Sequence, residues 1–145
     1  MFGGNAVMTG PDSLFLPEAD DLADPIPGIL WIELTSKCPF DCVFCSRQLR
    51  RGTGEHMDFR MFQALIGQLD RPGIIRLNYS GESTHYPHLE EAVQLAKSTG
   101  AITELVSAFA SISQKTLLGL VESGLDRLSL SVHTMDAQQY QEIYR

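Results

Sequence analysis

Strand-like and helix-like runs alternate along the chain from residue 29 onward, and this alternation restricts the fold more than any other feature of the sequence. Runs rich in β-branched and other apolar residues predict four strands, at 29–35, 74–79, 102–108 and 127–132. The segments that follow them carry apolar residues at helical spacing and predict four helices, at 58–70, 87–99, 113–123 and 136–145. A repeated strand–helix order gives parallel strands joined by right-handed crossovers, so the sequence predicts an α/β fold.

The expected helix boundaries rest on residues that start or stop helices. Asp58 and Ser113 are predicted to cap helix N-termini with their side-chain oxygens. Pro87 suits the first position of a helix, because that position leaves its backbone N–H unpaired and proline has none. Gly100 and Gly124 are predicted to end the second and third helices.

Length and composition predict one folded domain with an extension before it. The 145 residues suffice for one domain and not for two. Residues 1–27 are rich in glycine, aspartate and proline, so they are predicted to form a flexible N-terminal extension. Residues 28–145 are predicted to form the domain itself.

Charge and hydropathy argue against two classes of function. The formal net charge of −7 does not favour a broad nucleic-acid-binding surface. A membrane span needs an apolar run of about 20 residues, and the sequence has none. The N-terminus also lacks the cationic start and apolar block of a signal peptide, so a cytoplasmic location is predicted.

Several polar strand residues are expected to lie on the face of the sheet that the helices do not cover. Leu128, Leu130 and Val132 alternate with polar residues, which predicts that these three side chains face the helices. Glu33 and Arg76 are expected on the opposite face. A buried carboxylate needs a partner, so either these two side chains pair with each other or both are solvated near strand ends.

Cys38, Cys42 and Cys45 are the only cysteines of the chain, and they follow the first predicted strand with the spacing C-x3-C-x2-C. Clustered cysteines without a signal peptide indicate metal ligands in a reducing compartment rather than disulfides. Three thiolates are one short of filling either a cubane iron–sulfur cluster or a tetrahedral metal site. The alternative is a zinc site completed by His56 or by an outside ligand.

This cysteine motif, at the end of the first strand of a βα series, resembles that of the radical S-adenosylmethionine (radical SAM) superfamily over roughly residues 29–145. The resemblance implies a parallel (β/α) partial TIM barrel in which the three cysteines bind a [4Fe–4S] cluster. It implies that S-adenosylmethionine chelates the fourth iron. An electron from the reduced cluster would then split the sulfonium and yield a 5′-deoxyadenosyl radical, which abstracts a hydrogen atom from substrate.

The resemblance also assigns expected cofactor contacts. Phe44, before the last cysteine, matches an aromatic residue that packs near the adenine. Ser80, Gly81 and Glu82 match most of a Gly-Gly-Glu-Pro segment, in which Gly81 would let the backbone approach the ligand and Glu82 would accept from the ammonium group. Ser131 matches a cofactor-contacting serine at the end of the fourth strand, whereas the following His133 replaces the usual aspartate.

The family core usually has about six βα units, so the four units found here are expected to be the N-terminal part of a longer core domain. The resemblance implies a peptide or small-metabolite substrate, as in peptide-modifying maturases and molybdopterin-type cyclases. It also implies an electron donor such as a flavodoxin or ferredoxin. Two alternatives stay open: a non-catalytic three-cysteine zinc-binding interaction module, and an inactive fragment.

Overall fold

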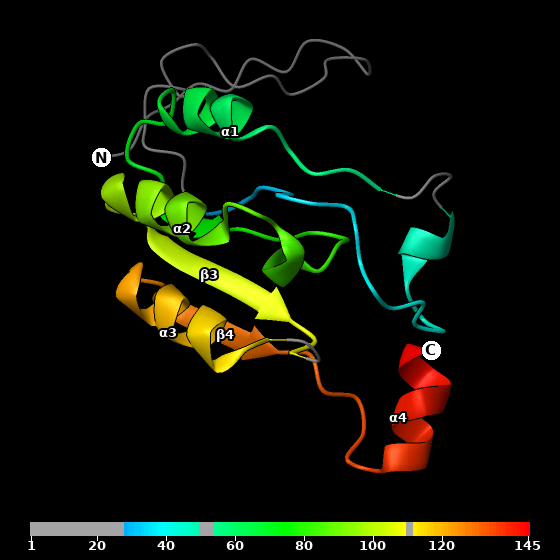
Figure 1. Cartoon of the computed structure of the whole chain (residues 1–145). Helices are drawn as coiled ribbons and strands as arrows, with labels where there is room; N and C mark the ends of the chain where they lie inside the picture. Colours follow the sequence, from blue (N-terminus) through cyan, green and yellow to red (C-terminus); the bar gives the residue numbers. More distant parts are fainter. Residues whose placement is uncertain (1–27, 50–53, 110–111) are drawn as a thin grey trace, which may run out of the picture.

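A four-stranded parallel sheet forms the centre of the computed structural model, which describes residues 28–49, 54–109 and 112–145 (Figure 1). The strands are β1 (Ile29–Trp31), β2 (Ile74–Arg76), β3 (Ile102–Ser107) and β4 (Arg127–Leu130), and they lie in this order across the sheet. All three neighbouring pairs are parallel. The predicted α/β fold is therefore confirmed, whereas the extension predicted at 1–27 lies outside the described residues.

The strands are shorter than the sequence predicted, most clearly at β1. The prediction for the first strand ran to Thr35, but regular pairing with β2 ends at Trp31. The Ile32 amide still donates to the carbonyl of Arg76 at 2.9 Å. Farther along, Thr35 pairs instead with His56 in an isolated antiparallel bridge. The chain thus leaves the sheet before the cysteines, and the segment before the first helix braces it.

Three helices follow the first three strands and lie on the same face of the sheet (Figure 1). They are α1 (Phe59–Ile66), α2 (Leu89–Ser98) and α3 (Gln114–Glu122). The predicted caps are confirmed, since Asp58 accepts from two amides of α1 and Ser113 accepts from the Thr116 amide. Pro87 was wrongly placed in the helix: α2 begins two residues later, and the side chain of its N-cap residue His88 makes no capping hydrogen bond.

The hydrophobic core fills the space between the sheet and these helices. Ile75, Leu105 and Phe62 are fully buried there, and Leu120 of α3 is nearly so. The alternation expected for the last strand holds at its start, where Leu128 packs against the core. Leu130 and Val132 were also expected to meet helices, but both side chains are about half exposed, at 52% and 53%.

The exposure of these two residues follows from the position of the fourth helix, α4 (Ala137–Tyr144), which does not cover β4. Figure 1 shows α4 apart from the other helices, at the carboxyl ends of the strands and beside the 3₁₀ helix η2 (Ser46–Leu49). Asp136 caps α4 by accepting from the Gln139 amide at 2.8 Å. The helix therefore belongs to the loop region rather than to the layer that covers the sheet.

The face of the sheet opposite the helices carries a row of charged residues. Arg76 of β2, Glu104 of β3 and Arg127 of β4 are neighbours in the strand register. Glu104 accepts from Arg76 at 2.6 and 3.0 Å and from Arg127 at 2.7 Å. The suggested pairing of Glu33 with Arg76 is therefore wrong: the Glu33 carboxylate instead accepts from the amide of Ser80 at 2.9 Å and from its hydroxyl.

Candidate functional site

The three cysteines lie on the loop after β1, which we call the cysteine loop (residues 38–45). All three side chains are partly exposed, and none forms a disulfide. A turn closes the loop at its end, where the Cys45 amide donates to the Cys42 carbonyl at 3.0 Å. The Arg47 amide lies 3.4 Å from the Cys45 sulfur, and the Arg47 guanidinium donates to the Phe40 carbonyl at 2.6 Å. Arg47, which follows the loop in η2 (Ser46–Leu49), thus braces it.

The thiols of the loop influence one another electrostatically. Burial raises the pKa of Cys38, and nearby Glu82 and Cys45 raise it further, while a backbone hydrogen bond at Phe40 and the Arg47 cation oppose this shift. Burial also raises the pKa of Cys42, together with the neighbouring Cys38 and Cys45 thiolates. Burial first, and adjacent negative charges after it, therefore make Cys38 and Cys42 of the free loop prefer the protonated form, and a bound cation would offset both effects.

The loop has the donor chemistry of an iron–sulfur site but not its closed arrangement. Within the described ranges, no three His, Cys, Asp or Glu side chains are placed so that they could hold a metal ion. The same finding covers a site completed by His56, so it does not distinguish the zinc alternative from the iron–sulfur one. Three partly exposed thiols within eight residues of one loop fit a [4Fe–4S] cluster in ligand type.

The segment Ser80–Ser83 packs directly against the start of the cysteine loop. The Glu82 amide donates to the Lys37 carbonyl at 2.9 Å. A Cβ atom on Gly81 would lie 2.1 Å from the Thr35 carbonyl oxygen and 2.7 Å from that of Lys37. Glycine is therefore required here, because the two backbones touch. Gly81 thus lies against the backbone just before Cys38, and its contact with a ligand stays a prediction.

Glu82 was predicted to accept from the ammonium group of a ligand, and in the structure its carboxylate is held by the chain itself. Glu82 is 6% exposed and precedes the short 3₁₀ helix η3 (Ser83–His85). One oxygen accepts from the Thr84 hydroxyl at 2.8 Å, and the other accepts from the Ala108 amide at 2.8 Å. Glu82 therefore links the ends of β2 and β3, and its contact with a ligand stays a prediction.

Phe44 and Ser131 both contact His133, the residue that stands where the family usually has an aspartate. The Phe44 ring is 56% exposed, and its centre lies 4.3 Å from that of the His133 ring. The Ser131 hydroxyl and His133 Nε2 are 3.1 Å apart. The two predicted cofactor residues thus flank one imidazole at the carboxyl end of β4.

The end of α4 also reaches the cysteine loop, which the sequence did not predict. The Val43 amide donates to the Ile143 carbonyl at 3.0 Å, and the Asp41 amide donates to the Tyr144 carbonyl at 3.2 Å. The helical pattern of residues 136–145 predicted a helix but did not predict which part of the molecule the helix contacts. Tyr140, Ile143 and Tyr144 form one helical stripe, and that stripe gave no signal of the surface it would contact.

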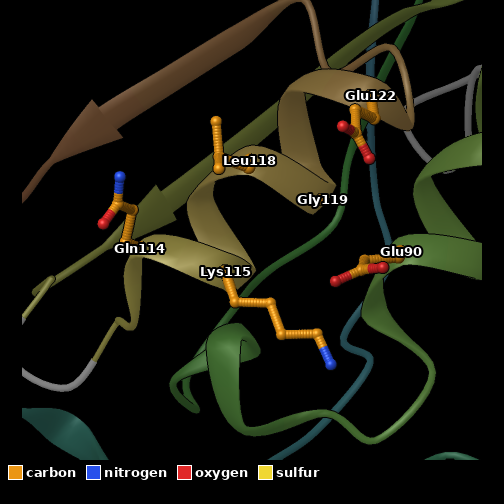
Figure 2. Close-up of a pocket in the computed structure, with 6 residues that line it drawn as sticks. All are labelled: Glu90, Gln114, Lys115, Leu118, Gly119 and Glu122. Atoms are coloured by element: carbon orange, nitrogen blue, oxygen red, sulfur yellow. The ribbon is translucent and has the colours of Figure 1, made fainter.

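One cavity of the described structure lies beside a predicted cluster ligand, Cys38. A cavity of about 330 Å³ beside the loop is lined by Lys37, Cys38, Pro39, His56 and His85. The Nδ1 atom of His56 is buried without a hydrogen-bond partner, and burial lowers the pKa of this imidazole. A cavity of about 430 Å³ lies far from the cysteines, between α2 and α3, where Glu90 packs beside Gly119 (Figure 2).

None of the helices in the described part of the chain has the length and apolar character that crossing a bilayer requires.

Comparison with known proteins identifies relatives of similar sequence. The chain is 30% identical over 115 residues to a PqqA peptide cyclase of Rhodopseudomonas palustris, an alignment that covers 77% of the chain and 30% of the relative. It is 29% identical over 116 residues to a GTP 3′,8-cyclase of Chlorobaculum tepidum, with 79% and 35% covered. The chain therefore spans about a third of the length of the curated relatives it matches.

Solved structures share the fold. BtrN in complex with AdoMet and 2-DOIA matches with a TM-score of 0.67 at 21% identity, over 79% of this chain and 49% of that one. Streptococcus suis SuiB bound to S-adenosylmethionine matches with a TM-score of 0.66 at 19% identity, over 79% and 27%. The family model described as the Radical SAM superfamily matches residues 32–145. The chain therefore belongs to the radical SAM superfamily, as its cysteine spacing indicated.

Proposed function

We propose that this chain carries the cofactor-binding part of a radical SAM enzyme, with Cys38, Cys42 and Cys45 as ligands of a [4Fe–4S] cluster. The observation that carries the proposal is the position of the cysteine loop beyond the carboxyl end of β1, directly after the residues Thr35 and Lys37 that contact Gly81. In parallel α/β folds this end of the strands is where ligands bind. The family match over residues 32–145 supports the same assignment.

When bound, the reduced cluster would supply one electron to the sulfonium of S-adenosylmethionine, which would break a C–S bond to give methionine and a hydrogen-abstracting 5′-deoxyadenosyl radical. The chain's own residues would bind and orient these groups. Phe44 would pack on the adenine, while Ser131 and the segment Ser80–Glu82 would contact the polar parts of the cofactor. Both carboxylate oxygens of Glu82 already accept hydrogen bonds from the chain. The ammonium group of the cofactor would donate a further hydrogen bond to this carboxylate, whose orientation is already fixed.

The substrate class that we propose is a peptide. The PqqA peptide cyclases among the relatives and a structure of SuiB bound to precursor peptide SuiA support it. A small metabolite is the second possibility, because a GTP 3′,8-cyclase is similar to the chain to nearly the same extent. The proposal includes a flavodoxin or ferredoxin as the electron donor and a cytoplasmic location, where thiols stay reduced.

Anaerobic reconstitution of the full chain with iron and sulfide tests this proposal. The wild-type protein should become brown with broad visible absorption, and Cys42→Ala should lose that absorption. Ser46→Ala, a substitution directly after the last cysteine, is the matched control and should load like the wild type. Dithionite and S-adenosylmethionine should then release 5′-deoxyadenosine. A colourless protein that binds one zinc ion, or a loaded protein that leaves S-adenosylmethionine intact, would contradict the proposal.

A further inference from the structure

Tyr144, at the end of α4, stands where three segments of the chain meet. Its ring lies 5.6 Å from that of Phe40 in the cysteine loop and 5.8 Å from that of His133 after β4. Within α4 it stacks on Tyr140 at 4.3 Å between ring centres. Tyr144 is 3% exposed, whereas most of α4 is exposed. The helix is therefore anchored mainly by this one side chain.

Hydrogen bonds connect the same residue to both of the segments that the helix joins. The Tyr144 hydroxyl donates to the Ser131 carbonyl at 2.5 Å. Its own carbonyl accepts from the Asp41 amide at 3.2 Å, and the preceding carbonyl accepts from the Val43 amide at 3.0 Å. Asp41 and Val43 are the two neighbours of Cys42. The backbone on either side of the central cysteine is thus bonded to the helix end that Tyr144 anchors.

These contacts fix the distance between two sets of residues assigned to the cofactor. Ser131 lies at the end of β4, and Phe44 lies on the cysteine loop, where its ring contacts His133. We propose that Tyr144 is a positioning residue that holds the cysteine loop against the end of β4. Phe44 and Ser131 are thereby placed so that both contact the same S-adenosylmethionine molecule. The inference rests on the proposed function and adds to it the element that sets the geometry of the site.

Tyr144→Phe in the full chain removes the hydroxyl and keeps the ring. Loss of one hydrogen bond should weaken the docking of α4 about three- to tenfold. In the metal-free protein, hydrogen exchange at the Asp41 and Val43 amides should then be faster by that factor. After reconstitution, iron content should equal that of the wild type, while the S-adenosylmethionine concentration that half-converts the electron paramagnetic resonance spectrum of the reduced cluster should rise three- to tenfold.

Tyr140→Phe is the matched control, because the Tyr140 hydroxyl makes no hydrogen bond with the described residues and the substitution keeps the stacked ring. It should leave both hydrogen exchange and the affinity for S-adenosylmethionine unchanged.

Phe40→Leu is a second test, made in the cysteine loop. It removes the ring that faces Tyr144 and should reproduce both the faster exchange and the weaker S-adenosylmethionine binding. It therefore tests the proposal even if Tyr144→Phe does not fold.

Three results would overturn the positioning role. The first is wild-type exchange and wild-type affinity for S-adenosylmethionine in Tyr144→Phe. The second is an equal loss in Tyr140→Phe, which would indicate general weakening of the helix. The third is a fall in affinity without faster exchange at the two amides. If the wild type itself takes up no iron, the proposed function fails separately, and hydrogen exchange in the metal-free protein alone decides whether Tyr144 holds the loop.

Discussion

The two faces of the sheet are stabilised by different forces. On the helix-covered face, Phe62, Ile75 and Leu105 are fully buried, and burial of apolar surface has no preferred direction. On the other face, Glu104 and its two arginine partners depend on direct hydrogen bonds. The helix-covered face tolerates apolar substitutions that keep the side-chain volume. The charged face loses stability when any one partner of an ion pair is removed. The candidate site lies at the carboxyl ends of the strands, where contacts are also directional.

The largest effect is expected on the helix-covered face. Phe62→Ala should lower the free energy of unfolding by about 4 kcal/mol, because it removes a fully buried ring and leaves a cavity. Met61→Ala, one residue earlier on the exposed side of α1, should cost less than about 0.5 kcal/mol. Urea denaturation followed by circular dichroism measures both. An equal loss of unfolding free energy in the two variants would show that Phe62 of α1 is not part of the hydrophobic core.

The next effect concerns the contact between the Gly81 segment and the start of the cysteine loop. Gly81→Ala should cost about 3 kcal/mol, because its Cβ would overlap the Thr35 carbonyl and backbone would have to move. Gly100→Ala separates this steric effect from backbone strain: Gly100 has φ +84° and open space around it, so about 1 kcal/mol is expected. The same denaturation assay compares the two. A cost for Gly81→Ala no larger than that for Gly100→Ala would contradict the close approach.

On the charged face, Glu104→Gln should cost about 2 kcal/mol. The carboxylate is largely buried, and its two arginine hydrogen bonds hold its pKa below the usual range. A neutral amide would leave Arg76 without its ion pair, although the more exposed Arg127 can turn to solvent. Glu91→Gln breaks an exposed pair with His88 and should cost less than about 0.5 kcal/mol. Similar losses in the two variants would mean that burial of Glu104 adds nothing.

The sequence predicted that the strands run parallel because strand–helix alternation has few solutions. Asp58, Ser113 and Gly124 marked helix ends correctly, since caps and left-handed turns depend on local chemistry. It did not predict the partner of Glu33, because side-chain pairing on the open face depends on register and on loops far along the chain. The position of α4 escaped prediction for the same reason: periodicity identifies a helix but not the surface that receives it.

The smallest effect concerns the carboxylate of Asp126, which lies just before β4 on the exposed surface. Hydrogen bonds from Lys97 at 2.7 Å and from the Thr103 amide at 2.8 Å lower its pKa to about 2 from an ordinary value near 3.8. Because the pKa is lower in the folded state, this group stabilises the fold above about pH 4, and the stabilisation disappears as pH falls toward 2. Solvent screening at this partly exposed position limits it to about 1 kcal/mol. Urea denaturation of the wild type and of Asp126→Asn between pH 5 and pH 2 should therefore give stabilities that differ at pH 5 and converge at pH 2. A difference that persists at pH 2 would mean that Asp126 acts through packing rather than through its charge.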